Sequence, residues 1–393
     1  MGHRRVVRSL ALVVAAALLS SCTIGDLGRA QSVVDAPETT QQSSPQPPEI
    51  NVENGETGVE PAEPVRVTAV AGLDSVTMTN ESGKEVEAEF NDDKSEWTTT
   101  EPLGYGRTYT VEARDTDGQR VVSSFTTLSP DATVHAYLGP LDGATVGVAQ
   151  AVTIRFDTAI QDTKAVEDLI NVETSNGTDG AFFWLDPYEV RWRPKEYWEP
   201  GTEVSVKANI YGHEMGEGLY GAQDSETHFT IGDKVEAVVD NNDKMLRVYA
   251  NDELVKEFPV SLGTDGTYDT PNGTYVVGDE HEKLTMDSRT YGLALDAGGY
   301  VTPVDYATQL SYSGIYVHSA PWASGALGSY NQSHGCINAS YDNAKWFQDY
   351  VKRGDPVVVK NTAGATLTPY DGLGYWNLDW EQRSGGSGEP LYP

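Results

Sequence analysis

The residues best suited to chemistry in this sequence are a cysteine and a histidine, Cys336 and His318, which lie 18 positions apart. A thiolate is a strong nucleophile, but an ordinary cysteine is mostly protonated near neutral pH. A neighbouring imidazole can take that proton and leave a thiolate–imidazolium pair. Gly335, directly before the thiol, lets the backbone turn tightly and aim its amides at a developing oxyanion. The pattern therefore predicts nucleophilic catalysis by Cys336 with His318 as the base.

Two other interpretations of these residues stay open at this point. A lone cysteine is often a small buried hydrophobic residue without chemical function. His318, His334 and Cys336 could also form a metal site, although no nearby carboxylate stands out as a further ligand.

The first of the two cysteines has a different context. Arginines within residues 3–8 precede an apolar run from Leu10 to Leu19, which is typical of a secretory signal peptide over residues 1–21. The run ends in Leu19-Ser20-Ser21-Cys22, which resembles the lipobox of bacterial lipoproteins. That resemblance implies lipidation of Cys22 and a lipid-anchored protein at the cell membrane, facing the extracytoplasmic cell wall. The alternative is an ordinary signal peptide with a chance cysteine near its cleavage site.

An acylated Cys22 would leave Cys336 without a disulfide partner. An unpaired thiol outside the cell is exposed to oxidation, so its retention favours a functional role.

Composition excludes several classes of protein. The 393 residues contain 59 Asp and Glu against 27 Lys and Arg, a formal net charge of −32. This excess argues against nucleic acid as a partner, because binding to the phosphate backbone depends on clustered Lys and Arg. With 38% hydrophobic and 22% charged residues, the chain is not wholly disordered. We interpret the acidic side chains as solvated, although an acidic surface could also attract amines or repel anionic polymers.

The elements that must position Cys336 and His318 are preceded by a linker and two β-rich segments. Residues 22–64 are rich in Pro, Gln, Ser and Glu and predict a flexible acidic tether. Alternating apolar and polar residues then predict strands in two domains, 65–130 and 131–233. The predicted strands include 65–67, 76–78, 86–90, 109–113, 152–156 and 204–208.

The two β-rich segments resemble each other. Trp97 precedes Gly106 by nine residues, and Trp192 precedes Gly201 by nine residues. Each glycine opens a strand-like run. The repeat predicts two tandem β-sandwiches of immunoglobulin-like architecture, which we interpret as spacers or rigid supports.

The last third of the chain carries the chemistry. Residues 234–362 read as short strands with one helix, capped by Ser340 and ending before Gly354. Ala344, Phe347 and Val351 lie at helical spacing on one face of that helix. Residues 363–393 form a C-terminal extension.

The motif around the thiol resembles the signature of the L,D-transpeptidases. It consists of His318, 17 intervening residues and Cys336, with Ser-His-Gly-Cys-Ile-Asn from Ser333 to Asn338. Residues 270–275 resemble the family's conserved turn, 286–292 its flap over the substrate, and 372–377 the extension of actinobacterial members.

The resemblance implies a mainly β chain with two Ig-like domains, a catalytic β-sandwich with one main helix, and a short extension. Where close relatives have Asp after Gly374 this chain has Tyr375, so the contacts of the extension are expected to differ.

The family's reaction assigns roles to individual residues. Cys336 would attack the L,D bond of a peptidoglycan tetrapeptide stem and form a thioester, releasing D-Ala. A diaminopimelate amine of an acceptor stem would then form a 3→3 cross-link. His318 would be base and then acid, its ring held by the carbonyl of Ser319. The expected oxyanion hole consists of the amides of His334, Gly335 and Cys336. The expected substrate-binding residues are Met286, Tyr300, Trp322, Ser333, His334 and Asn338.

The resemblance also bears on partners and on rival functions. Carbapenems are expected as covalent inhibitors, and no cofactor is expected. Trp322 could instead be a packed core aromatic. The same site could hydrolyse the thioester, as an L,D-carboxypeptidase. A sortase-like enzyme is disfavoured because no arginine closely follows Cys336, and a non-catalytic wall-binding lipoprotein is the alternative outside enzymology.

Overall fold

The computed structural model describes residues 46–381. The predicted signal peptide, Cys22 and the first part of the predicted linker lie outside these residues. The described chain is mainly β, as expected, and contains two α-helices, α1 (Thr163–Asp168) and α2 (Tyr341–Tyr350). Among the described residues, the longest helices are too short and too polar to cross a bilayer.

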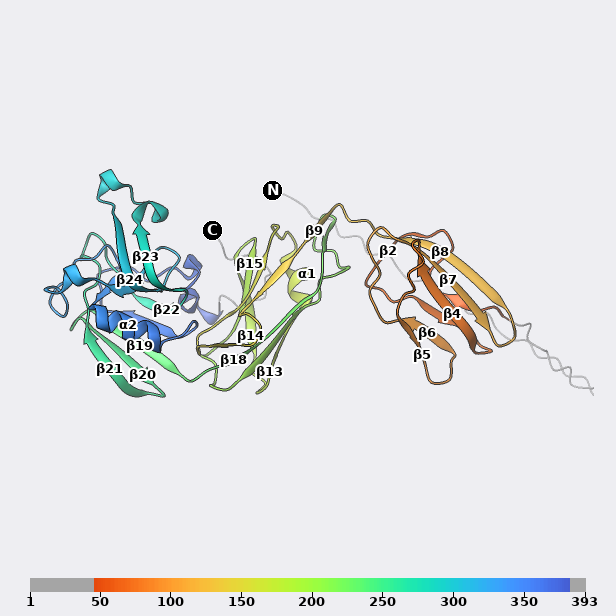
Figure 1. Ribbon diagram of the computed structural model, residues 1–393, viewed down its shortest axis with the longest axis horizontal. Coiled ribbons are helices and arrows are strands. Elements are labelled where there is room, and N and C mark those ends of the chain that lie inside the picture. Colours follow the sequence, from red (N-terminus) through yellow and green to blue (C-terminus); the bar gives the residue numbers. More distant parts are fainter. Residues whose placement is uncertain (1–45, 382–393) are drawn as a thin grey trace, which may run out of the picture. The chain divides into compact units, whose positions relative to one another are not determined.

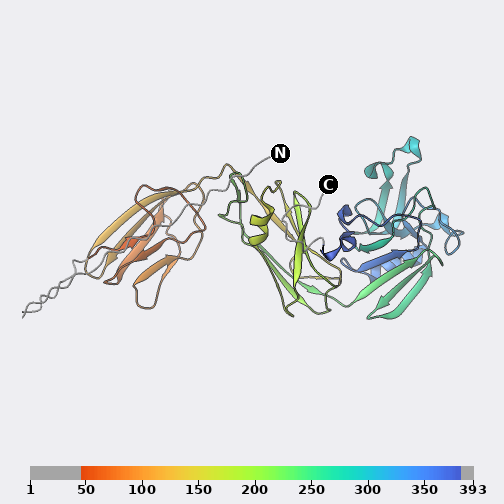
Figure 2. The same cartoon turned by 180° about the vertical axis from the view of Figure 1, so that it is seen from behind.

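The first sandwich packs two four-stranded sheets face to face (Figure 1). Their strand orders are β1-β3-β6-β5 and β2-β8-β7-β4. Seen from behind, the two layers appear in orange to yellow (Figure 2). Strands β3, β4, β5 and β7 overlap the predicted strands, and Trp97 in β6 is buried between the sheets. The strands are β1 (Glu49–Ile50), β2 (Thr57–Val59), β3 (Arg66–Thr68), β4 (Leu73–Asn80), β5 (Ala88–Phe90), β6 (Glu96–Thr99), β7 (Thr108–Asp115) and β8 (Arg120–Thr127).

The predicted linker extends too far toward the C-terminus. β1 and β2 fall inside residues 22–64, and Val52 and Val59 belong to the core of the first sandwich. Both strands have at most three residues, and single valines stand there among Glu, Gly and Asn. Strands this short do not show an alternation of apolar and polar residues, so the composition of residues 22–64 alone predicted a tether.

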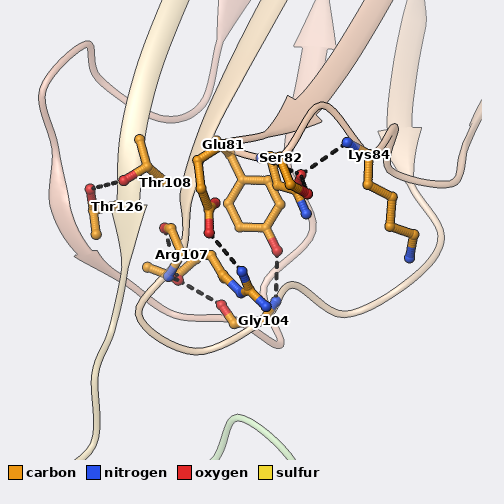
Figure 3. A network of polar contacts seen from close by, with 10 residues as sticks. Glu81, Ser82, Lys84, Gly104, Arg107, Thr108 and Thr126 are labelled. Atoms are coloured by element: carbon orange, nitrogen blue, oxygen red, sulfur yellow. Dashed lines mark hydrogen bonds and ion pairs between the residues drawn. The ribbon is translucent and has the colours of Figure 1, made fainter.

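The turn that opens β7 is fixed by polar contacts. Arg107 and Glu81 pair at 2.6 Å, and Thr108 faces Thr126 across the β7–β8 pair (Figure 3). Gly106 has φ +60°, in the left-handed region that glycine enters without strain. Gly201 has φ +81° at the matching place in the second sandwich. The repeated glycine is therefore explained by a repeated turn.

The second sandwich has the same strand order as the first. Its sheets run β10-β12-β15-β14 and β11-β18-β16-β13, so every strand has a counterpart at the same place in the first sandwich. The strand pairs β2–β8 and β11–β18 are both parallel. An additional parallel pair joins β9 to β17. It has no counterpart among the described strands of the first sandwich. The strands are β9 (Ala132–Val134), β10 (Ala136–Gly139), β11 (Ala144–Val146), β12 (Val152–Phe156), β13 (Ile170–Thr174), β14 (Gly180–Asp186), β15 (Glu189–Pro194), β16 (Glu203–Ala208), β17 (Leu219–Gly221) and β18 (Ser225–Ile231).

The remaining described chain forms two sheets around one core. A five-stranded sheet has the order β21-β20-β19-β27-β22, and a four-stranded sheet has the order β23-β24-β25-β26. Figure 1 shows β23 and β24 side by side as a long hairpin. The strands are β19 (Val235–Asp240), β20 (Met245–Ala250), β21 (Glu253–Pro259), β22 (Gly273–Val276), β23 (Glu280–Asp287), β24 (Val301–Gln309), β25 (Tyr316–Ser319), β26 (Ile337–Ala339) and β27 (Pro356–Lys360). Short 3-10 turns are η1 (Ser288–Tyr291), η2 (Leu295–Ala297), η3 (Pro321–Ala323), η4 (Pro369–Asp371) and η5 (Tyr375–Asn377).

Helix α2 begins as predicted but ends earlier. The Ser340 hydroxyl accepts from the Asn343 amide at 3.3 Å, and Ala344 and Phe347 are buried in the core. Val351 is already extended, with ψ 166°, so Lys352 and Arg353 lie beyond the helix. The side chain of Val351 still packs in the core. Because it also lies at helical spacing, the sequence predicted that Val351 belongs to the helix.

The C-terminal extension docks on the second sandwich. The Tyr375 hydroxyl donates to the carbonyl of Ala149 at 2.8 Å and accepts from the amide of Ala151 at 3.0 Å. The guanidinium of Arg191 donates to the carbonyl of Gly372. The guanidinium carbon of Arg193 lies 3.8 Å from the ring centre of Trp376, a cation–π contact.

Candidate active site

Strands β25 and β26 bring His318 and Cys336 to one place. β25 holds His318, and Cys336 stands directly before β26. The two strands pair in parallel, with His318 opposite Asn338. Both are short and buried. β25 lies between β24 and β26 and packs on α2, and Ile337 and Ala339 of β26 belong to the same core. The predicted base and nucleophile thus line the same cavity.

His318 is held as a neutral base. Its Nδ1 atom lies 2.9 Å from the carbonyl oxygen of Ser319, the contact expected from the sequence. Because a carbonyl oxygen can only accept, Nδ1 carries the hydrogen and Nε2 keeps a free electron pair. Burial lowers the pKa of His318, and the hydrogen bond to Ser319 only partly opposes this. The ring is therefore poised to accept a proton at Nε2.

Cys336 rests as a protonated thiol. It is 5% exposed, and its Sγ donates to the carbonyl oxygen of Gly314 at 3.4 Å. Burial raises the pKa of the thiol to about 12, and the backbone N–H of Tyr316 only partly opposes this. A buried thiolate without a countercharge is costly, so the predicted role of Cys336 depends on a base, such as the predicted His318, that takes its proton.

The loop before the thiol is closed by Ser333. Its hydroxyl donates to the carbonyl of Cys336 at 2.6 Å and accepts from the amide of Gly335 at 3.1 Å. Gly335 has φ +117°, a conformation that side chains disfavour. Ser333 thus supports the loop, and one of the three amides expected in the oxyanion hole is already bonded. The roles of the His334 and Cys336 amides stay predictions.

A cavity of about 360 Å³ opens over Cys336. It is lined by all six side chains expected to bind substrate, together with the predicted nucleophile and the predicted base. Trp322 is 56% exposed at its mouth, so the alternative of a packed core aromatic is wrong. The lining residues are Met286, Tyr300, Thr302, Val304, His318, Trp322, Gln332, Ser333, His334, Cys336 and Asn338.

The flap between β23 and β24 forms one wall of the cavity. Met286, near the end of β23, is buried beside Cys336. His334 packs between the rings of Tyr268 and Tyr300, at centroid distances of 4.3 and 4.9 Å. Its Nε2 also lies 3.2 Å from the carbonyl oxygen of Gly298 in the flap. His334 therefore joins the flap to the loop that carries Cys336.

Several site residues were not predicted from the sequence. Thr302, Val304 and Gln332 line the cavity. Thr270 is fully buried, and its hydroxyl donates to the carbonyl of Gly335 at 2.7 Å. The sequence feature that could have identified Thr270 is its place in the turn of residues 270–275. No sequence feature could have identified Gly314, because it contacts Cys336 through its backbone oxygen.

The metal alternative has no support in the geometry. Between residues 46 and 381, no three His, Cys, Asp or Glu side chains gather in an arrangement that would hold a metal ion.

Comparison with known proteins places this geometry in a family. A family model described as the L,D-transpeptidase catalytic domain matches residues 234–359. Another, described as a bacterial Ig domain, matches residues 56–214. The chain is also 45% identical over 396 residues to L,D-transpeptidase 2 of Mycobacterium tuberculosis, covering 98% of this chain and 97% of that protein. This chain belongs to the L,D-transpeptidase family.

Two further relatives agree with this membership. L,D-transpeptidase 5 of M. tuberculosis is 35% identical over 337 residues, which cover 82% of this chain and 73% of that protein. A solved structure of the LD transpeptidase LdtMt1 in complex with imipenem aligns with a TM-score of 0.51 at 38% identity, covering 59% of this chain and 100% of that one. The expected family, the fold class and the enzyme class are therefore confirmed: the protein is an L,D-transpeptidase, an enzyme of peptidoglycan cross-linking.

Proposed function

We propose that this L,D-transpeptidase makes 3→3 cross-links with Cys336 as nucleophile and His318 as base and acid. The observation that carries the proposal is the pairing of β25 with β26, which places both side chains in one cavity with the predicted substrate-binding residues. In the first step His318 Nε2 takes the thiol proton, and sulfur attacks the carbonyl carbon of the L,D bond. That C–N bond breaks, the proton passes from His318 to the leaving D-Ala amine, and a thioester forms.

The second step regenerates the enzyme. The side-chain amine of an acceptor diaminopimelate attacks the thioester, and His318 takes the proton that this amine loses. The new amide is released, and the proton returns to sulfur. Each amide broken is replaced by one amide formed, so no external energy source is needed.

Water and the acceptor amine compete for the same thioester. If water reaches it, the product is a tripeptide and the enzyme acts as an L,D-carboxypeptidase. The half-exposed Trp322 at the cavity mouth supports the amine route, because an open, apolar rim can receive a second stem peptide.

The test is incubation of the purified protein with tetrapeptide stems, with products analysed by mass spectrometry. We expect cross-linked dimer and free D-Ala from the wild type and neither from Cys336→Ala. Tripeptide without dimer would contradict transpeptidation. Full activity of Cys336→Ala would contradict the site and favour the non-catalytic, wall-binding interpretation.

We extend the proposal to carbapenem inhibition. The relative LdtMt1 has been solved in complex with imipenem. In this chain the thiolate of Cys336 would open the β-lactam ring by the same attack that it makes on the stem. Intact-mass measurement should show one adduct on the wild type and none on Cys336→Ala.

The membrane anchor is a separate proposal that rests on sequence alone. The Leu19-Ser20-Ser21-Cys22 segment supports lipidation of Cys22, and thereby a location on the outer face of the cell membrane. Metabolic labelling with a fatty acid should mark the wild type. Labelling that persists in Cys22→Ala would contradict the proposal.

A further inference from the structure

The carbonyl that accepts the Cys336 thiol belongs to a tight turn between β24 and β25. Gly314, which supplies this oxygen, has φ +97° and is buried. Within the turn, the Ser311 hydroxyl accepts from the amide of Ile315 at 2.8 Å. The turn is therefore short and well defined, and its position sets where the acceptor oxygen lies.

Asp371, in the C-terminal extension, holds this turn from outside. One carboxylate oxygen accepts from the Tyr312 amide at 2.7 Å, and the other accepts from the Ser313 amide at 3.0 Å. Asp371 is only 8% exposed, so both charge-assisted bonds are shielded from water. Gly372, the next residue, lies against the Tyr312 ring so closely that a Cβ there would come within 2.2 Å of it.

The flap reaches the same turn from the other side. A Cβ on Gly314 would lie 2.7 Å from the ring of Tyr291, so this ring packs directly on the glycine. The Tyr291 hydroxyl also meets the hydroxyl of Tyr316, the first residue of β25, at 3.3 Å. The extension and the flap thus clamp one turn between them, and the turn touches the nucleophile.

We propose that Asp371 is a positioning residue which, together with Tyr291, keeps the Gly314 carbonyl on the Cys336 thiol and so keeps the nucleophile protonated until a donor stem enters. A carbonyl oxygen stabilises an S–H group but repels a thiolate, so this contact opposes ionisation. In an oxidising environment this contact protects the thiol, because a protonated thiol resists oxidation better than a thiolate does. The proposal rests on the proposed role of Cys336 as nucleophile.

The titratable groups around the thiol do not obscure a test. His318 and His334 line the cavity with it, and the hydroxyls of Tyr275, Tyr300 and Tyr316 also face it. Burial raises the pKa of all three hydroxyls, that of Tyr300 to about 12. They stay neutral between about pH 6 and pH 10, so their ionisation does not contribute to the alkylation rate of the thiol in that range.

The experiment measures the rate of Cys336 alkylation by iodoacetamide against pH, in the full chain without substrate. Asp371→Ala should move the profile to lower pH and raise the rate at about pH 8 by about three- to tenfold, as expected for the loss of one hydrogen bond to the thiol. Asp371→Asn keeps one acceptor oxygen and should show a smaller shift in the same direction. Asp355→Asn is the matched control, because Asp355 is also buried but pairs with Lys352 instead of the turn.

Tyr291 variants provide a second route if Asp371→Ala does not fold. Tyr291→Ala removes the ring from Gly314 and should shift the profile as Asp371→Ala does, whereas Tyr291→Phe keeps the ring and should leave it in place. Folded Asp371 and Tyr291→Ala variants with the wild-type profile would overturn the proposal. A wild type that forms no thioester with tetrapeptide would instead overturn the proposed function, while the alkylation profile would still report on the contact with Gly314.

Discussion

The Nδ1 atom of His318 lies 2.9 Å from the carbonyl oxygen of Ser319, the next residue in the same strand. The partner that orients the base is thus a neutral backbone group, where many catalytic triads use a carboxylate. A carbonyl fixes the tautomer as well as a carboxylate does, but it adds no full negative charge to stabilise the imidazolium. This explains why the pKa of His318 stays below its ordinary value, since burial is not offset by a countercharge.

The first prediction concerns pH. In the proposed mechanism neutral His318 is the reactive form, and burial lowers its pKa, so the acid limb of the acylation rate should lie below about pH 6.5. The measurement is the rate of carbapenem adduct formation across pH. His318→Gln should abolish this limb and slow acylation by about 10²- to 10⁴-fold. An acid limb above about pH 7 would show that the base is not the buried imidazole described above.

The second prediction concerns Thr270. Its hydroxyl donates to the carbonyl of Gly335 and accepts from the amide of Gly263 at 2.9 Å. Thr270→Val keeps the shape but leaves both groups unsatisfied, which should cost about 1–3 kcal/mol of unfolding free energy. Acylation should slow by about tenfold, since the loop behind the thiol loosens. Urea unfolding and adduct kinetics measure both effects. Thr267→Val, at an exposed site, is the control and should change neither.

The third prediction concerns the loop glycine. At Gly335, alanine would adopt a disfavoured φ of +117° and place its Cβ 3.0 Å from Ile315. We expect Gly335→Ala to lower kcat at least tenfold, with a smaller effect on KM, because the amides around the oxyanion shift. Gly118→Ala is the matched control, since Gly118 has φ +83° but open space around it. If both variants lost activity equally, backbone strain alone would explain the result.

The fourth prediction concerns the docking of the extension. Tyr375→Phe leaves the buried amide of Ala151 without its partner, whereas the carbonyl of Ala149 keeps its bond from Trp376 at 2.8 Å. The expected loss is about 1–3 kcal/mol of unfolding free energy, with the acylation rate of the folded protein unchanged. Tyr341→Phe, at a residue that is 47% exposed and whose hydroxyl makes only an exposed contact with the Tyr306 hydroxyl, should cost much less in the same urea experiment. Equal stabilities of Tyr375→Phe and the wild type would exclude this contact as a support of the fold.

Local patterns in the sequence were sufficient for many strands of the two sandwiches, and the motif around Cys336 was sufficient for the family. The alternation of apolar and polar residues predicted strands in both sandwiches, and the repeat of Trp and Gly spacing predicted that the two sandwiches are similar. The alternation fails at β1 and β2, because strands this short show no period. Helical spacing fails at Val351, because this buried residue fits both a helix face and the extended chain that follows the helix.

The supports of the site could not be predicted because they join distant parts of the chain. Asp371 bonds a turn 59 residues away, and Thr270 bonds the carbonyl of Gly335 across 65 residues. These bonds end on backbone atoms, so the side chain of the partner residue gives no indication of the contact. Only the folded chain places them together.

The segment between β25 and β26 has an evolutionary consequence. Residues 320–336 return the chain so that the two strands run in parallel, and Trp322 and Gln332 on the same segment form part of the cavity wall. Exchanges at residues 320–332 can reshape the entrance, while the paired strands keep His318 and the loop of Cys336 in register. Substrate preference and catalytic competence can thus drift independently in this protein, although both are encoded within a stretch of about twenty residues.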